Sequence, residues 1–132
     1  MSLVDKLIVV VDDEPDTAEM FAEMLRLNGY QVFKTYGGAE AIDVIRQKRP
    51  NAIVLDLMMP DVSGFDVLSA LQHDKELALI PVIVVSARSK TGEIQSDPQV
   101  KNYVYLTKPV AYLDLKEAVD GAILAAQSKT SG

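Results

Sequence analysis

The chain of 132 residues is long enough for one domain with its own core, and its 48% hydrophobic and 24% charged residues are typical of a globular domain rather than a disordered one. Its 19 acidic and 13 basic residues give a net charge of -6, which disfavours binding to nucleic acid phosphates and to anionic lipid. Cysteine is absent, which excludes disulfides, zinc thiolate sites and cysteine nucleophiles and suits the cytoplasm, and no apolar run is long enough to span a membrane.

Five segments of the chain are predicted to be β-strands. Residues 7–11, 53–55 and 82–85 are short, unbroken apolar runs rich in β-branched side chains, which is the pattern of strands buried on both faces. Residues 31–34 and 103–106 alternate in polarity or carry aromatic and β-branched residues, as partly covered strands do.

Four further segments carry apolar residues at helical spacing. They are marked by Ala18, Phe21, Met24 and Leu25; by Ala41, Ile42 and Ile45; by Phe65, Leu68 and Leu71; and by Leu115, Ala118, Val119, Ala122 and Ile123. Residues 89–101 differ, because Gly92 and Pro98 interrupt them, and we expect a short or irregular fourth helix that ends before Pro98. The alternation of strand and helix predicts an α/β fold with a doubly wound, five-stranded parallel sheet. We expect residues 1–132 to form a single domain, with flexible termini at 1–4 and 127–132.

Polar residues that carry chemistry follow the predicted strands. Asp12 and Asp13 come directly after the first strand, Asp56 after the third and Ser86 after the fourth, and Lys108 comes soon after the fifth. The carboxyl ends of the strands share one edge of such a sheet, so we expect these side chains to meet there. Three adjacent carboxylates repel one another and require a cation. Oxygen ligands without histidine or cysteine favour a hard ion, and we expect Mg²⁺.

The same edge suits a phosphoryl group. A magnesium ion, the Lys108 ammonium and the Ser86 hydroxyl together neutralise phosphoryl charge, which is most of what phosphoryl transfer needs. Asp56 lies on the central strand and is the candidate acceptor, because a carboxylate can form an acyl phosphate.

Three of these residues also have a purely structural interpretation. Asp12 and Asp13 are residue types that cap helices or form turns, and Ser86 at a strand end can cap the segment that follows. Pro60 and Gly64 are turn residues ahead of a helix, in a loop that must also shape the pocket.

Four motifs resemble, in order and spacing, the receiver domain of two-component response regulators. They are Val-Val-Asp-Asp-Glu at 10–14, Leu-Asp-Leu-Met-Met-Pro-Asp-Val-Ser-Gly at 55–64, Ser-Ala at 86–87 and Lys-Pro at 108–109. Spacings of 43, 30 and 22 residues separate Asp13, Asp56, Ser86 and Lys108. The resemblance covers essentially the whole chain and implies a flavodoxin-like fold with the strand order 2-1-3-4-5.

The resemblance implies that Asp56 is the site of phosphorylation. It implies that Mg²⁺ is bound directly by Asp13, Asp56 and the backbone carbonyl of Met58, and by Asp12 through water. Met58 and Arg88 stand where relatives vary the lifetime of the acyl phosphate.

The resemblance also implies a conformational switch. Ser86 and Lys108 are implied to bind phosphoryl oxygens, and Tyr105 to move inward when Ser86 moves toward the phosphoryl group. Tyr105 has an alternative interpretation, because a tyrosine on a peripheral strand commonly buries its ring and leaves its hydroxyl in water. The peptide bond before Pro109 is implied to be cis.

By the same resemblance the chain is a phosphorylation-dependent signalling switch of a two-component phosphorelay. A sensor histidine kinase or a phosphotransfer protein would supply the phosphoryl group to Asp56, and a downstream output protein or a covalently linked effector domain would respond. Such a domain is no enzyme beyond its own phosphorylation and dephosphorylation. We expect no direct contact with nucleic acid or membrane.

Two other functions stay open from the sequence. A receiver-like interaction domain regulated without phosphorylation is suggested by residues 89–104, since Lys101-Asn102-Tyr103-Val104 replace a Gly-Ala-Asp-Asp-like turn of relatives. A haloacid-dehalogenase-type phosphohydrolase also uses aspartate, lysine and Mg²⁺. It requires Asp-x-Asp after the first strand, whereas this chain has Asp12-Asp13-Glu14 and is too short for the usual cap.

Overall fold

The computed structural model describes residues 6–57, 64–87 and 103–131. In chain order these form β1 (Leu7–Val11), α1 (Pro15–Leu27), β2 (Gln31–Thr35), α2 (Gly38–Lys48), β3 (Ala52–Asp56), α3 (Gly64–Gln72), the 3-10 helix η2 (Leu77–Leu79), β4 (Val82–Ser86), β5 (Tyr103–Thr107) and α5 (Tyr112–Ser131). The predicted fourth helix at 89–101 and the N-terminal segment 1–4 lie outside the described residues. Helix α5 continues to Ser131 and so includes most of residues 127–132, for which a flexible terminus is predicted from the sequence.

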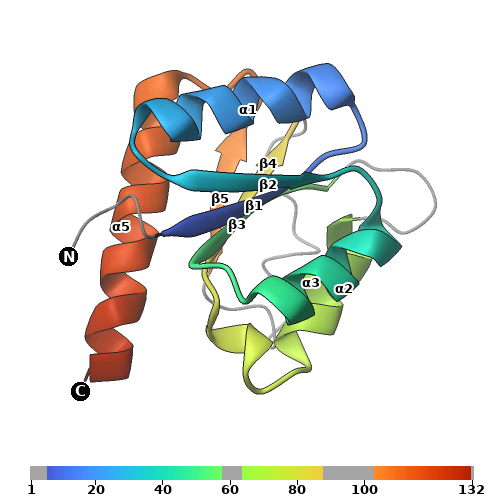
Figure 1. Ribbon diagram of the computed structural model, residues 1–132, viewed down its shortest axis with the longest axis vertical. Coiled ribbons are helices and arrows are strands. Elements are labelled where there is room, and N and C mark those ends of the chain that lie inside the picture. Colours follow the sequence, from blue (N-terminus) through green and yellow to red (C-terminus); the bar gives the residue numbers. More distant parts are fainter. Residues whose placement is uncertain (1–5, 58–63, 88–102, 132) are drawn as a thin grey trace.

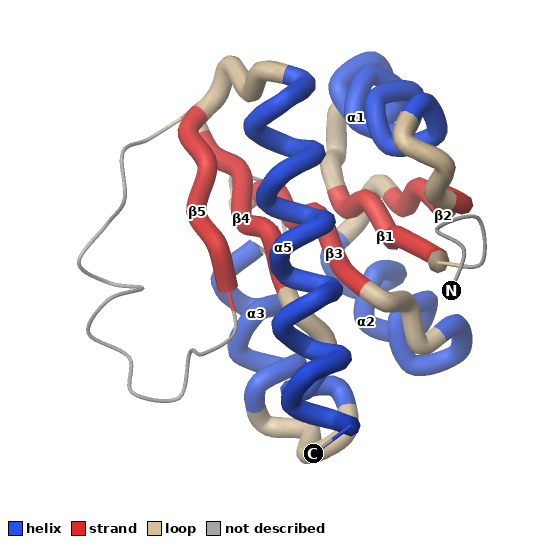
Figure 2. The backbone as a smooth tube through the Cα atoms, turned by 90° about the vertical axis from the view of Figure 1, so that its left-hand side faces the viewer, coloured by secondary structure: helices blue, strands red, loops and turns tan. Residues whose placement is uncertain are grey.

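All five strands belong to one sheet with the order β2-β1-β3-β4-β5, and every pairing is parallel (Figure 2). The predicted α/β fold and strand order are therefore confirmed. Strands β3 and β4 are buried along their whole length, whereas the edge strands β2 and β5 alternate between covered and exposed residues. This difference explains why the central strands are unbroken apolar runs and the edge strands are not.

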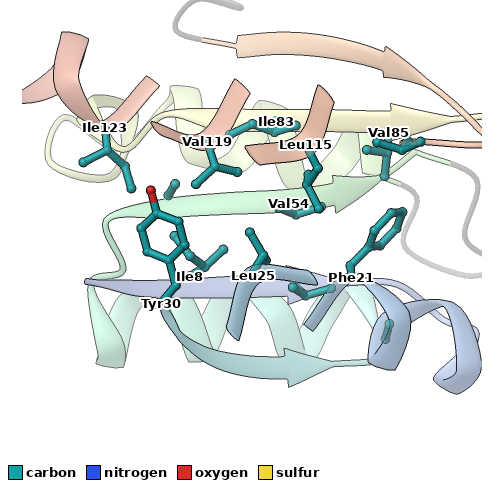
Figure 3. Close-up of a cluster of buried hydrophobic side chains, with 14 residues drawn as sticks. Ile8, Phe21, Leu25, Tyr30, Val54, Ile83, Val85, Leu115, Val119 and Ile123 are labelled. Carbon is teal, nitrogen blue, oxygen red and sulfur yellow. The ribbon is translucent and has the colours of Figure 1, made fainter. Parts of the chain in front are cut away.

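Helices cover both faces of the sheet (Figure 1). Helices α1 and α5 lie on one face, and α2 and α3 lie on the other (Figure 2). Successive residues of β1 point to opposite faces, so Val9 packs in the core beneath α2 and α3, while Ile8 packs in the core beneath α1 and α5. Figure 3 shows the second core, in which Leu25 of α1 and Val119 of α5 belong to one cluster with the sheet residues Ile8, Val54 and Ile83. The two cores hold the strands as a rigid platform.

A polar cluster around Asp120 joins α5 to the turn between α1 and β2. The Asp120 carboxylate accepts hydrogen bonds from the Tyr30 hydroxyl, from Asn28 Nδ2 at 2.9 Å and from Lys116 Nζ at 3.1 Å. The Tyr30 side chain is only 3% exposed, and its hydroxyl points toward α5 (Figure 3). One carboxylate thus satisfies three donors, one of which is almost completely buried.

Thr35, the last residue of β2, is fully buried and faces the α2 side of the sheet. It pairs with Val11 in the parallel register, and its backbone carbonyl accepts a hydrogen bond from the Asp12 N–H at 3.1 Å. Among the described residues its side-chain Oγ1 has no hydrogen-bond partner. A buried hydroxyl without a partner lowers stability, because the water it loses on folding is not replaced.

We therefore expect Thr35→Val to raise the free energy of unfolding by about 1 kcal/mol, since valine keeps the shape and removes the unpaired oxygen. Urea unfolding followed by circular dichroism measures this change. Thr107→Val is the matched control, because Thr107 ends β5 in the same way but is exposed, and its stability should change little. A loss of stability in Thr35→Val larger than in the control would contradict the prediction.

Candidate functional site

Three carboxylates meet at the carboxyl edge of the sheet. Asp12 and Asp13 directly follow β1, and Asp56 is the last residue of the neighbouring strand β3. One carboxylate oxygen from each of the three lies within 4.8 Å of the others. Asp12 and Asp56 are only 1% and 3% exposed, whereas Asp13 is partly exposed. The cluster therefore has two buried acids and one that faces solvent.

Backbone hydrogen bonds hold Asp12 in place. Its N–H continues the ladder to β2 by donating to the Thr35 carbonyl, and its Oδ1 accepts the Glu14 N–H at 3.0 Å. Helix α1 begins directly afterwards with Pro15 in its first turn, where a missing N–H costs nothing. The loop thus fixes one oxygen of Asp12 and leaves Oδ2 for the pocket.

Lys108 lies between the two buried carboxylates. Its Nζ is 3.4 Å from Asp12 Oδ2 and 3.4 Å from Asp56 Oδ2, and its side chain is 24% exposed. The Lys108 N–H donates to the Ser86 carbonyl at 2.7 Å, and the Lys108–Pro109 peptide bond is cis. The loop after β5 is thereby tied to the end of β4, and its ammonium reaches the acidic cluster.

The pKa of Asp12 reflects both its burial and the charges around it. Burial raises the pKa of Asp12 above its ordinary value, and the negative charge of Asp56 raises it further. The Glu14 N–H and the Lys108 ammonium lower this pKa but do not cancel the increase. Three carboxylates face one ammonium in this cluster, and their excess negative charge favours a further cation there.

Ser86 lies on β4, the strand next to β3 and Asp56, and Tyr105 lies on β5, one strand further out. Ser86 is 1% exposed and ends β4, one residue beyond Val85, which pairs with Asp56. Tyr105 of β5 pairs with Val84 of β4, and its partly buried ring packs against the core beneath α2 and α3.

The structure thus brings Asp12, Asp13, Asp56 and Lys108 together and places Ser86 at the end of the adjacent strand. Met58 and Arg88 lie outside the described residues. The expected carbonyl ligand of Met58 and the expected influence of both residues on the lifetime of the acyl phosphate therefore stay predictions.

The sequence predicts Gly64 as a turn residue in a loop that shapes the pocket, and it indicates no role for Thr35. In the structure the Gly64 backbone lies against the Asp56 backbone, and the Thr35 carbonyl accepts a hydrogen bond from the Asp12 N–H. The glycine in the loop motif was the signal for the first of these contacts. Nothing in the sequence marks the second, because any residue at position 35 supplies a carbonyl.

Residues 8–120 match the family model of the response regulator receiver domain, and the chain belongs to this family. It is 34% identical over 106 residues to the polar-differentiation response regulator DivK of Brucella anthropi, covering 80% of this chain and 86% of that protein. A receiver domain of a Francisella response regulator superposes with a TM-score of 0.80 at 27% identity, covering 92% of this chain and 98% of that one. The signal receiver domain of a histidine kinase from Syntrophus aciditrophicus superposes with a TM-score of 0.81 at 27% identity, covering 91% of each chain.

The chain is therefore a receiver domain of the two-component type, which is a signalling domain and not a classical enzyme. This family membership decides against the phosphohydrolase interpretation. The acidic cluster of Asp12, Asp13 and Asp56 is a site that could bind a metal ion. Within the described part of the chain, no helix has the length and apolar character needed to cross a membrane.

Proposed function

We propose that this domain is a phosphorylation-dependent switch in which Asp56 is the phosphoacceptor. The observation that carries the proposal is the environment of Asp56. This carboxylate ends a central strand, lies 3.4 Å from the Lys108 ammonium and shares its edge with two further carboxylates. A nucleophilic oxygen, a fixed positive charge and ligands for a cation thus meet within one small pocket.

In the proposed reaction an Asp56 carboxylate oxygen attacks the phosphorus of a phosphohistidine on a sensor histidine kinase or phosphotransfer protein. The new bond joins Asp56 to phosphorus, and the phosphorus–nitrogen bond breaks with its electron pair returning to the imidazole. Lys108 contacts the transferred oxygens and stabilises their charge, which is the main requirement of phosphoryl transfer. The signal ends by hydrolysis, in which water attacks the phosphorus and the Asp56 carboxylate leaves.

The residues present fit Mg²⁺. Three carboxylates without nitrogen or sulfur ligands form a hard, oxygen-only donor set, and their mutual repulsion favours a divalent cation. Asp13 and Asp56 would hold the ion directly and Asp12 through water, with the Met58 carbonyl as a further ligand. When bound, the ion supplies positive charge to the phosphoryl oxygens.

The proposed output depends on Ser86 and Tyr105. Ser86 would bind a phosphoryl oxygen on Asp56, and its movement would let the Tyr105 ring turn inward from its present position against the core beneath α2 and α3. A downstream protein or a linked effector domain would read this change, and we propose that it does so in the cytoplasm.

The test of this function is the intact mass of the wild-type protein after exposure to acetyl phosphate with and without Mg²⁺. We expect a gain of one phosphoryl group that requires Mg²⁺ and that disappears on further incubation with Mg²⁺ once acetyl phosphate has been removed. No gain under any condition would overturn the proposal and leave an interaction domain that works without phosphorylation.

Mg²⁺ is expected to raise the melting temperature of the wild-type protein, because it binds only the folded cluster. At about ten times the dissociation constant the gain is ~1.4 kcal/mol, or roughly 3–6 °C for a domain of this size. Asp13→Ala should lose most of this shift, since Asp13 is the most accessible of the three ligands. Asp43→Ala on the exposed face of α2 is the control and should keep it. A melting temperature that ignores both Mg²⁺ and EDTA in wild type would count against the metal site.

A further inference from the structure

Gly64, the first residue of α3, packs closer to the acceptor strand than any side chain could. A Cβ built on Gly64 would lie 2.4 Å from the Asp56 carbonyl oxygen and 2.4 Å from Leu57 Cα. Carbon atoms in favourable contact lie about 3.5–4.0 Å apart, so neither approach is possible without movement. The Gly64 backbone is not in the left-handed region, so the constraint is space and not conformational freedom.

The two sides of this contact are both firmly held. The Gly64 N–H donates to the Leu57 carbonyl at 3.2 Å, and the Leu57 N–H donates to Val85 of β4 at 3.3 Å. Asp56 also lies in the parallel ladder between β3 and β4. The atoms that a Cβ would strike are therefore backbone atoms at the end of β3 and directly after it, which cannot turn away as a flexible side chain would.

Helix α3 is held as firmly as the strand. Val67, Leu68 and Leu71 are at most 1% exposed and fix α3 in the core that it shares with α2. Close-packed interiors transmit such a displacement instead of absorbing it. A side chain at position 64 would therefore displace the Asp56–Leu57 peptide, which carries the carboxylate 3.4 Å from Lys108.

We infer that Gly64 is a positioning residue for the acceptor. Its missing side chain lets the first turn of α3 rest on the Asp56 carbonyl, and this contact fixes the direction from which the Asp56 carboxylate reaches Lys108, Asp12 and Asp13. This inference rests on the proposed function of Asp56 for its consequence in phosphorylation, but its effect on the acidic cluster does not depend on that function.

The experiment compares Gly64→Ala with two matched variants. Gly121→Ala adds the same methyl group on α5, where a Cβ would meet nothing within 4 Å. Leu68→Ala loosens the same helix by creating a cavity, without adding an atom near Asp56. Each protein is titrated with Mg²⁺ while its amide resonances are followed, and its phosphorylation by acetyl phosphate is timed by intact mass.

Gly64→Ala is expected to weaken Mg²⁺ binding about tenfold, as loss of a supporting contact to a metal ligand commonly does, and to shift the amide resonances of Asp56 and Leu57. Phosphorylation should slow by about tenfold or more, because a displaced nucleophile loses its alignment. Gly121→Ala should match the wild type. Leu68→Ala should bind Mg²⁺ and accept the phosphoryl group normally at temperatures where it is folded.

Wild-type behaviour of Gly64→Ala in both assays would overturn the inference, and so would an equal loss in Leu68→Ala at the same folded fraction. The assays are repeated in trimethylamine oxide, which favours the folded state, and failure of Gly64→Ala to fold even there would reduce the role of Gly64 to folding alone and overturn positioning. If the wild type is never phosphorylated, the proposed function fails, while the Mg²⁺ titration still decides on Gly64.

Discussion

Asp56→Asn is expected to abolish the mass gain of one phosphoryl group under acetyl phosphate and Mg²⁺. An amide in place of the carboxylate is no nucleophile toward phosphorus, and the change removes one charge from the pocket. The fold should be retained, because asparagine has nearly the same shape and the strand ladder at Asp56 is formed by backbone atoms. Removal of a buried negative charge near Asp12 also relieves repulsion, so the metal-free variant should unfold at the same or a higher temperature than wild type.

The control for this variant is Asp43→Asn, which makes the same chemical change on the exposed face of α2. It should be phosphorylated at the wild-type rate. A full mass gain that persists in Asp56→Asn would place the acceptor at another residue and contradict the assignment of Asp56. Loss of the gain in both variants would instead indicate an effect of overall charge.

Asp120→Ala is expected to lower the free energy of unfolding by about 3 kcal/mol, which is among the larger effects a single substitution produces. The change leaves the buried Tyr30 hydroxyl without its acceptor and also removes the partner of Asn28 and Lys116. A buried donor that loses its partner costs its desolvation in full. Asp120→Asn keeps an oxygen for Tyr30 and should lose less, and Asp114→Ala on the exposed face of the same helix should change little.

The same contact has a pH signature. Burial and the Asp120 carboxylate raise the pKa of Tyr30 far above its ordinary value of about 10. Because the folded-state pKa is the higher one, the stabilisation from Tyr30 is complete below pH ~10 and declines as the pH rises beyond it. Tyr30→Phe should therefore be less stable than wild type near pH 8, with a difference that shrinks in alkali. Urea unfolding at several pH values measures both effects, and a constant difference would contradict the proposed pairing.

The type of fold could be predicted from the sequence because its signals are local. The runs at 7–11, 53–55 and 82–85 are apolar on both faces, and only strands at the centre of a parallel sheet bury both faces. Helical spacing between them left little choice of architecture. The meeting of Asp12, Asp13 and Asp56 follows from the same rule, since each ends a parallel strand and such ends lie at one edge.

Only the tertiary structure decided which atoms touch. Lys108 reaches Asp12 across 96 residues, and Tyr30 reaches Asp120 across 90, and no local pattern records either pair. The Thr35 hydroxyl has no partner within the described ranges because β2 is deeply covered there, and Gly64 contacts the Asp56 backbone because α3 lies close to the sheet. Periodicity tells which face of an element is buried, but the distance between packed elements is set by side chains from both, so contacts of a few ångströms emerge only when the whole chain is folded.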